Sequence, residues 1–303
     1  MRREKTGVRE ELLRNIGFLN EREQALLEQA RVAVAGVGGV GGIHLLTLAR
    51  LGIGRFTIAD PETFEKVNIN RQFGACVSTL GMNKAQVMAA LLADINPACD
   101  ISTYGEKISA DNVKSFLEGA DVFVDGIDFF EIEARRLLFR EARERGIFAL
   151  TAAPLGFGAT LQVFSPRGMA FDEYFGISDG MDYREKIAAF ASGLAPRPYH
   201  IRYMDFSKVN LSDGTGPALS LACTLSASLV ATEVVKILTG KGDIKAAPHY
   251  LQVDLLRRKF TRGYIPWGGK NPLQKLKKRL ILRKALASIP RQEDDTLKSP
   301  AAG

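Results

Sequence analysis

The stretch Arg31–Gly42, RVAVAGVGGVGG, decides how this sequence folds. It begins as a short apolar run rich in β-branched valine, which is typical of a buried parallel strand. The run breaks into glycines at Gly36, and a helical pattern, IHLLTLARLG, follows and ends at Gly52 and Gly54. A second strand, RFTIAD, ends at Asp60. The order strand, helix, strand predicts a βαβ unit.

Strand and helix signals continue to alternate after this unit. Helices are expected at 83–95, 110–118 and 131–145, and strands at 99–109, 121–126 and 147–152. Such alternation predicts a mostly parallel sheet covered by helices on both faces. We therefore expect a doubly wound, Rossmann-like α/β fold.

The pattern changes after Pro154. A strand is expected at 158–166, followed by a long segment of weak periodicity, 167–215, which we interpret as a functional loop or lid whose few apolar side chains form a satellite core. Residues 217–239 form a helix that is apolar nearly all round and must be buried in the core or in a subunit interface, and 249–259 form a final strand. The expected division is a helical arm (1–30), a nucleotide-binding domain (31–153), a completing region with the insertion (154–270) and a basic, mobile tail (271–303).

Composition excludes several classes of protein. The chain has 303 residues, a quarter of them charged, and no uninterrupted apolar run long enough to span a bilayer, so we expect a cytoplasmic protein without a transmembrane segment. Its three cysteines are widely spaced, which excludes both a disulfide framework and a CxxC zinc pair. We expect no zinc.

The formal net charge of +7 is concentrated near the carboxyl end, where nine Lys and Arg residues fall within 259–284. A basic tail could contact RNA phosphates or an anionic membrane. We favour a solvated helix with its charges on the outer face.

The glycine-rich turn is typical of phosphate binding. Gly36, Gly38, Gly39 and Gly41 lie between the first strand and first helix, where a tight backbone and free amides at a helix start bind an anion. Asp60 closes the next strand and is placed to accept hydrogen bonds from a ribose. A nicotinamide-dependent oxidoreductase would show the same features.

Two basic residues favour a triphosphate over a dinucleotide. Arg71 lies just after the second strand, at the edge where phosphates would bind, and Lys84 begins the next helix. Two cations suit the charge that develops on a leaving pyrophosphate. Asp128 follows a buried parallel strand, at the carboxyl edge where open sheets bind ligands, and is a candidate Mg²⁺ ligand.

At these residues the chain resembles the ThiF/MoeB/HesA family, bacterial activating enzymes for thiamine and molybdopterin sulfur carriers that share the adenylation domain of ubiquitin-activating enzymes. The likeness covers roughly 14–153 and 217–239. It implies an ATP- and Mg²⁺-dependent adenylyltransferase that forms a homodimer, with Asp60 on the ribose, Arg71 and Lys84 on the phosphates and Asp128 on the metal. The motif residues are the glycines at 36–41, Asp60, Asn68, Arg71, Gln72, Lys84 and Asp128. Arg14 resembles the arginine that one subunit contributes to its partner's ATP site.

The sequence departs from the family pattern in three places. Phe129 follows Asp128 where relatives have asparagine, the zinc-binding CxxC pairs are missing, and no cysteine occurs in 167–217, where thioester-forming members place theirs. We interpret Cys223, which lies within the apolar helix 217–239, as a small buried apolar residue.

The function that we expect is adenylation of a carboxylate, giving an acyl-adenylate and pyrophosphate. The carboxylate could belong to a ubiquitin-like carrier protein, a peptide or a small molecule. An alternative within the family is cyclisation of a threonylcarbamoyladenosine on tRNA, which the basic tail supports. A nicotinamide-dependent oxidoreductase and a nucleotide-binding module without catalysis remain alternatives of other classes.

Overall fold

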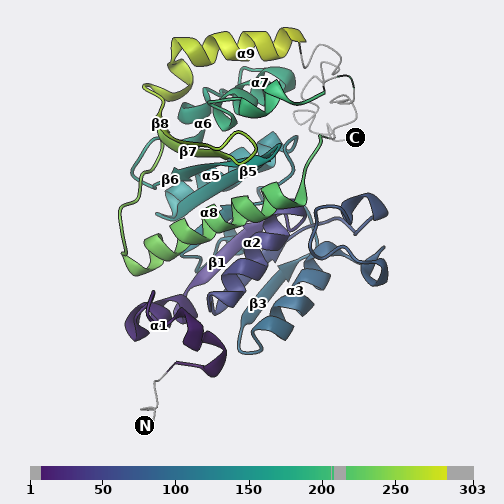
Figure 1. Cartoon of the computed structure of the whole chain (residues 1–303), viewed down its shortest axis with the longest axis vertical. Helices are drawn as coiled ribbons and strands as arrows, with labels where there is room; N and C mark the ends of the chain where they lie inside the picture. Colours follow the sequence, from purple (N-terminus) through teal and green to yellow (C-terminus); the bar gives the residue numbers. More distant parts are fainter. Residues whose placement is uncertain (1–7, 206, 208–215, 285–303) are drawn as a thin grey trace, which may run out of the picture.

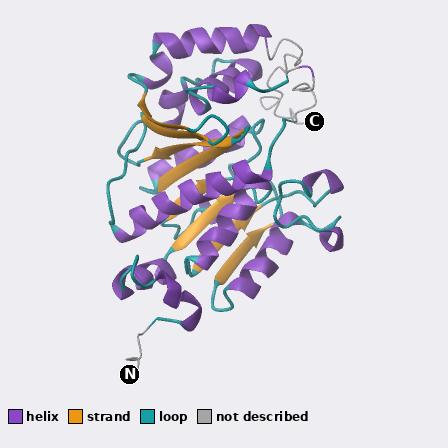
Figure 2. Cartoon of the chain, in the orientation of Figure 1, coloured by secondary structure: helices purple, strands orange, loops and turns teal. Residues whose placement is uncertain are grey.

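The computed structural model describes residues 8–205, 207 and 216–284 of the chain. Eight strands in this part form one sheet. In chain order they are β1 (Arg31–Ala35), β2 (Arg55–Ala59), β3 (Asp100–Tyr104), β4 (Val122–Asp125), β5 (Phe148–Leu155), β6 (Gly158–Phe164), β7 (His249–Asp254) and β8 (Lys259–Tyr264). The order across the sheet is β3-β2-β1-β4-β5-β6-β7-β8. Figure 2 shows the strands in orange, with helices in purple packed around them.

The first five strands pair in parallel, and β6, β7 and β8 continue the sheet in antiparallel pairs. From β1 the chain crosses to β2 on one side, and it later returns to β4 on the other side. This reversal is the switch point at which doubly wound sheets bind ligands, outside the carboxyl ends of the strands. The predicted fold class is confirmed.

Helices cover both faces of the sheet (Figure 1). They are α1 (Glu21–Gln29), α2 (Gly39–Arg50), α3 (Lys84–Ile95), α4 (Val113–Phe116), α5 (Ile132–Glu144), α6 (Phe171–Phe175), α7 (Tyr183–Leu194), α8 (Ser220–Thr239) and α9 (Pro272–Lys284). Short 3₁₀ helices join them: η1 (Glu10–Asn15), η2 (Lys66–Asn68), η3 (Val77–Thr79), η4 (Tyr199–Arg202) and η7 (Gly268–Lys270).

Two hydrophobic cores result from the alternation of side chains along the strands. On β1, Val32 and Val34 point into the core shared with α1, α2, α3 and α8. Ala33 and Ala35 point the other way, into the core shared with α4, α5, α6 and α7. Since successive strand residues face opposite sides, a strand buried on both faces must be apolar throughout, as RVAVA is after its first residue.

Helix α8 is long and apolar enough to cross a membrane if only length and composition are considered, with a mean hydropathy of 1.7 over its best window. In the fold it packs on α2 and on strands β5 and β6. Its buried residues include Cys223, Val230 and Val234, and its exposed positions include Thr224, Ser228 and Thr232. A helix in the core of a folded protein can be as apolar as one that spans a membrane. The contacts of α8 with α2, β5 and β6 are those of a core helix.

The segment expected to be a loop or lid, 167–215, contains helices α6, α7 and η4, while residues 206 and 208–215 lie outside the described part. Phe171, Tyr174 and Phe175 of α6 are buried in the core shared by α4, α5, α6 and α7, rather than in a separate satellite core. This part of the prediction was wrong, because aromatic residues in this segment complete the core beside α5.

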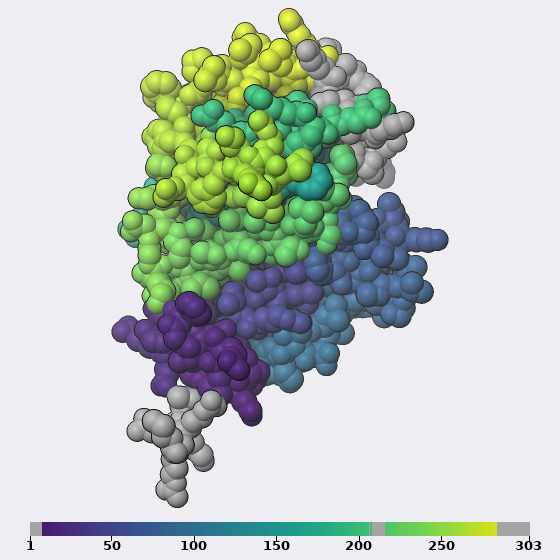
Figure 3. Space-filling model, viewed as in Figure 1, coloured from purple at the N-terminus to yellow at the C-terminus, as the bar shows by residue number. Residues whose placement is uncertain are grey.

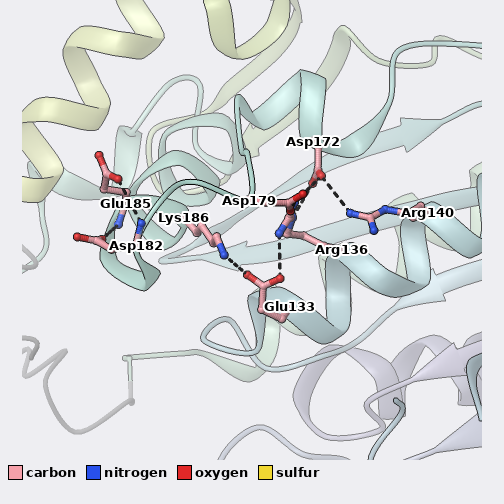
Figure 4. A network of polar contacts seen from close by, with 8 residues as sticks. All are labelled: Glu133, Arg136, Arg140, Asp172, Asp179, Asp182, Glu185 and Lys186. Carbon is pink, nitrogen blue, oxygen red and sulfur yellow. Dashed lines mark hydrogen bonds and ion pairs between the residues drawn. The ribbon is translucent and has the colours of Figure 1, made fainter. Parts of the chain in front are cut away.

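An ion-pair network holds these helices against α5 (Figure 4). The Arg136 guanidinium contacts Asp172 at 2.8 Å and Asp179 at 2.6 Å, and Glu133 joins Arg136 on its own helix to Lys186 of α7. Arg136 is buried, and its multiple partners satisfy several of its donors. The segment is thus fixed to the body of the fold by both apolar and charged contacts.

Candidate functional site

Three glycines bring β1, α2 and β4 into backbone contact at the switch point. Gly36 has φ +76°, and a Cβ on Gly41 would lie 1.8 Å from the Gly36 carbonyl oxygen. A Cβ on Gly126, directly after β4, would lie 2.2 Å from the same oxygen. No side chain fits at these positions. Gly126 was not predicted, although its place after the apolar strand 121–125 is a visible signal.

Gly38 and Gly39 serve a different purpose, because they open toward side chains of the site. The nearest atoms to a Cβ on Gly38 would belong to Gln72, at 3.3 to 3.4 Å, and those to a Cβ on Gly39 would be Cys223 Sγ at 3.5 Å and Arg71 Cγ at 3.9 Å. The first turn of α2 has no side-chain cap. Its amides and the positive end of the helix dipole are therefore directed at this space, which suits an anion.

Asp60 lies at the end of β2 and is 5 % exposed. Its Oδ2 accepts a hydrogen bond from the Val37 amide at 2.8 Å, and its Oδ1 accepts one from the Glu62 amide at 2.9 Å. Burial raises the pKa of Asp60, while these two hydrogen bonds and Lys84 act to lower it. The carboxylate that we predicted on the ribose thus also anchors the glycine-rich turn, with lone pairs left for a ligand.

The motif residues Asn68, Arg71 and Gln72 lie in the segment beside the glycine turn. Asn68 is buried and caps its own turn by accepting the Glu65 amide, which is a structural use. Arg71 lies next to Gly39 and donates to the Val67 carbonyl and to Asn70 Oδ1 at 3.0 Å. The Gln72 side chain is 7 % exposed, and its Oε1 has no hydrogen-bond partner. An unsatisfied buried amide oxygen beside a glycine turn suits a site that pairs with a ligand.

Lys84 begins α3 and is almost fully buried, with 4 % exposed. Its Nζ forms a 2.5 Å ion pair with Oε2 of Glu62, whose side chain is largely exposed. The Phe64 ring lies 6.0 Å from the same nitrogen. The cation is therefore buried close enough to Asp60 to lower the pKa of that carboxyl group, and its partner Glu62 faces solvent.

Asp128 lies in the loop after β4, two residues beyond Gly126, and is exposed. Its Oδ1 accepts a hydrogen bond from the Phe130 amide at 2.9 Å. No cluster of three or more His, Cys, Asp or Glu side chains that could hold a metal ion occurs in the described residues. A single carboxylate still fits Mg²⁺, because this ion is usually bound through one or two carboxylates together with substrate phosphates.

Arg135 shapes the loop that presents Asp128, and the sequence alone did not identify it. It pairs with the buried Asp125 at 2.7 Å and donates to the carbonyls of Ile127 and Asp128 at 2.5 and 3.1 Å. Thr151 also donates to Asp125, at 2.7 Å. Asp125 is therefore the structural acid of this strand end, and Asp128 is the accessible one.

Arg14 is the one proposed site residue that a single chain does not bring to this site. It lies in η1, where the neighbouring Leu12 packs on Gly52 and Asn15 donates to the Leu51 carbonyl. These contacts are at the carboxyl end of α2, about 18 Å along the helix from the glycine turn, at 1.5 Å per residue.

The cysteines support the sequence interpretation. Cys223 is buried under the glycine turn, and burial raises its pKa to about 11. Its thiol is therefore protonated at neutral pH and is a poor nucleophile. Cys76 is exposed and is the N-cap residue of the 3₁₀ helix η3.

Several known proteins are similar to this chain. The probable adenylyltransferase/sulfurtransferase MoeZ of Mycobacterium tuberculosis is 29 % identical over 220 residues, which cover 73 % of this chain and 50 % of MoeZ. The tRNA threonylcarbamoyladenosine dehydratase of Haemophilus influenzae is 34 % identical over 130 residues, or 43 % of this chain and 50 % of that protein. The chain thus spans about half the length of these curated relatives.

Solved structures share the fold. MccB of E. coli in a structure with ATP has a TM-score of 0.63 at 18 % identity, covering 87 % of this chain and 72 % of that one. The E. coli tRNA N6-threonylcarbamoyladenosine dehydratase, TcdA, has a TM-score of 0.57 at 22 % identity, covering 76 % and 95 %.

The ThiF family model matches residues 12–272, which include the switch point and every residue of the candidate site. This chain belongs to the ThiF family.

Proposed function

We propose that this protein uses ATP and Mg²⁺ to adenylate a carboxylate. The observation that carries the proposal is that the ends of three strands meet at one point. Asp60, at the end of β2, accepts a hydrogen bond from the glycine turn that follows β1. Gly126, at the end of β4, packs on the same turn, and Arg71 lies beside it. These contacts support a site in which the dipole of α2, the two cations Arg71 and Lys84, and the accessible carboxylate of Asp128 would surround the bound nucleotide.

The chemistry suits nucleotidyl transfer. A carboxylate oxygen of the substrate would attack the α-phosphorus, the bond to the bridging oxygen would break, and pyrophosphate would leave. Arg71 and Lys84 would stabilise the charge on the phosphates, and Asp128 would hold Mg²⁺, which neutralises the leaving group. A nicotinamide enzyme would leave these three residues without a role.

The substrate is proposed only as a class, a carboxylate on a carrier protein, a peptide or a small molecule. The MoeZ relative is named as an adenylyltransferase and sulfurtransferase. In this chain no cysteine occurs in 167–217, and the Cys223 thiol is buried and protonated. We therefore propose that the acyl group passes directly from the adenylate to its acceptor, without an enzyme thioester.

A second candidate is the dehydration of threonylcarbamoyladenosine on tRNA, in which the activated carboxylate is attacked from within the same molecule. Relatives of this name are 34 % identical over 130 residues and 38 % identical over 103 residues of this chain. The absence of a thioester cysteine from 167–217 suits such a cyclisation. The two candidates share the adenylation step and differ in the acceptor.

We also propose a homodimer in which Arg14 reaches the ATP site of the partner subunit. Within one chain Arg14 lies at the far end of α2, so any contact with phosphates requires a second copy. A mixed dimer of an Arg14→Ala chain and an Asp128→Asn chain tests this, because it should regain one complete site.

The central experiment compares Asp128→Asn, after the carboxyl end of β4, with a control before the amino end of that strand, Asp121→Asn. Asp121 precedes β4 at the opposite edge and accepts the Arg31 amide at 2.8 Å. Pyrophosphate release would be measured with peptides bearing free carboxyl ends and with tRNA bearing threonylcarbamoyladenosine, and ATP affinity by calorimetry. Asp128→Asn should lose on the order of 10²–10³ in rate while still binding ATP.

Two outcomes would contradict the proposal. Wild-type turnover in Asp128→Asn would remove Asp128 from the site. Thermal stabilisation by NAD but not by ATP would contradict the proposed adenylation reaction. The difference would be detectable, because a ligand at ~100 times its dissociation constant adds about 2.7 kcal/mol to the free energy of unfolding.

A further inference from the structure

The last described part of the chain, 255–284, contains eleven Lys and Arg residues and no Asp or Glu. The remainder of the sequence has thirty Lys and Arg against thirty-four Asp and Glu, so the positive charge of the protein is concentrated here. These residues form β8, η7 and α9. Figure 3 shows them in yellow at one end of the molecule, away from the N-terminal arm in purple.

Helix α9 meets our expectation of charges outside and apolar residues inside only in part. Its packed face contains Gln274, Lys277, Lys278, Ile281 and Leu282. Lys277 donates to the Pro196 carbonyl at 3.0 Å, and Lys278 lies 3.8 Å from Glu185 of α7. Two lysines are thus used for packing, although three leucines of the same helix are exposed.

The exposed face of α9 has two parallel rows. Leu273, Leu276 and Leu280 are 68, 52 and 46 % exposed and follow the i, i+3, i+7 spacing of one helix face. Lys275, Arg279 and Arg283 are also exposed and follow the i, i+4, i+8 spacing. The helix therefore presents an apolar row beside a cationic row over about 20 Å, at 1.5 Å per residue.

The segment that leads into α9 also has exposed apolar and cationic side chains. Trp267 directly precedes η7, has a positive φ of 59° and is 68 % exposed. On the edge strand β8, Phe260 and Tyr264 are 63 and 56 % exposed, with the exposed Arg262 between them. Large exposed apolar groups interleaved with cations are unusual on a solvated surface and mark an interaction site.

We propose that this end of the protein, α9 with Trp267 and β8, docks on an anionic membrane surface. Leucine and tryptophan side chains would enter the boundary between headgroups and acyl chains, while Lys and Arg contact lipid phosphates. An RNA partner would use the cations and aromatic rings, but would leave the leucine row without apolar contacts. The inference does not depend on the reaction proposed above.

The sequence supplies its own probe, because Trp267 is the one tryptophan in the chain. The full-length protein would be mixed with vesicles of phosphatidylcholine alone, or of two parts phosphatidylcholine to one part phosphatidylglycerol. We expect flotation with the anionic vesicles only, a blue shift of the tryptophan emission and quenching by lipids brominated in their acyl chains. High salt should weaken the binding.

Two triple variants separate the rows. Lys275→Glu/Arg279→Glu/Arg283→Glu should lower vesicle partitioning by about 100-fold or more. Leu273→Ser/Leu276→Ser/Leu280→Ser should lower it about tenfold or more and reduce the blue shift. All six side chains are exposed, and circular dichroism with thermal melting checks that the fold is kept. The matched control, Arg22→Glu/Arg50→Glu/Lys114→Glu, makes the same charge change on exposed residues elsewhere and should bind normally.

Three results would overturn the proposal. These are equal binding to neutral and anionic vesicles, undiminished binding by the leucine variant, and no vesicle binding together with a gel shift of tRNA that the charge-reversal variant abolishes. The last result would identify this end of the protein as an RNA surface instead.

Discussion

The Asp60 carboxylate accepts the Val37 amide at 2.8 Å, so the end of β2 directly fixes the turn that follows β1. The two residues are 23 positions apart in the chain. One carboxylate therefore shapes the glycine turn and, in the function proposed above, also receives the ribose. A substitution of Asp60 therefore tests both roles of this carboxylate in ATP binding.

Asp60→Ala should weaken ATP binding by about 10- to 100-fold, since it removes a charged acceptor from both the ribose and the turn. Asp60→Asn should be intermediate, because its amide oxygen keeps one acceptor. Calorimetric titration with ATP measures the effect. Asp94→Ala, an exposed acid on α3, is the control. Unchanged affinity in Asp60→Ala would show that the ribose binds elsewhere.

Lys84→Met should keep ATP binding within about tenfold and reduce pyrophosphate release by about 10²–10³-fold, because its charge acts mainly on the leaving phosphates. Glu62→Gln removes the ion-pair partner at 2.5 Å and should leave the rate within about threefold, since Glu62 is exposed. Single-turnover assays distinguish the two. A normal rate in Lys84→Met would exclude the lysine from the chemistry.

Arg135→Ala should destabilise the fold by about 3–5 kcal/mol, because it leaves the buried Asp125 carboxylate without its cation. Asp125→Asn combined with Arg135→Met should recover part of this loss, as no buried charge then remains. Urea denaturation gives the values. Arg143→Ala, an arginine on the same helix bonded to the Gly168 carbonyl, should cost much less. Equal losses for Arg135 and Arg143 would contradict the role of the buried pair.

Lys277 should make the docking of α9 sensitive to pH. Burial and, to a smaller extent, the nearby Arg197 lower its pKa to about 8, whereas the unfolded chain has the ordinary value of 10.5. Between about pH 8 and 10.5 the unfolded state therefore binds more protons, and stability rises with pH. Below pH 8 both states are protonated and this contribution no longer changes.

The measurement for Lys277 is the difference in melting temperature between wild type and Lys277→Met from pH 7 to 10. The methionine variant should be the more stable protein at pH 7, and the difference should shrink as pH rises, while Lys275→Met should show no such trend. A constant difference across this range would mean that Lys277 keeps its proton in the folded state.

Most of the sheet was predictable because each buried strand has its own apolar run, and the βαβ order places the glycine turn, Asp60 and Asp128 at one edge. Strand β8 was not predicted, since an edge strand with Lys259, Arg262 and Gly263 has no such run. Helix α7 was also missed, although Asp182 and Glu185 form a capping box that is visible in the sequence.

Other features depend on contacts that no local pattern specifies. Asp125 and Asp128 are close in sequence, and only the position of Arg135 decides that the first is buried and the second accessible. The orientation of α9 was unpredictable for a similar reason. Its apolar residues lie on both sides of the helix, so its periodicity does not show which side faces the protein.

The packing of α8 on α2 has a consequence for the order of folding. The apolar side of α2 is synthesised early, yet the helix that covers it ends at Thr239. During synthesis the apolar side of α2 therefore stays exposed until nearly two hundred further residues have left the ribosome. Such an intermediate is prone to aggregate. We expect chains truncated before α8 to require chaperones, even though they contain the glycine turn and every cation proposed for ATP.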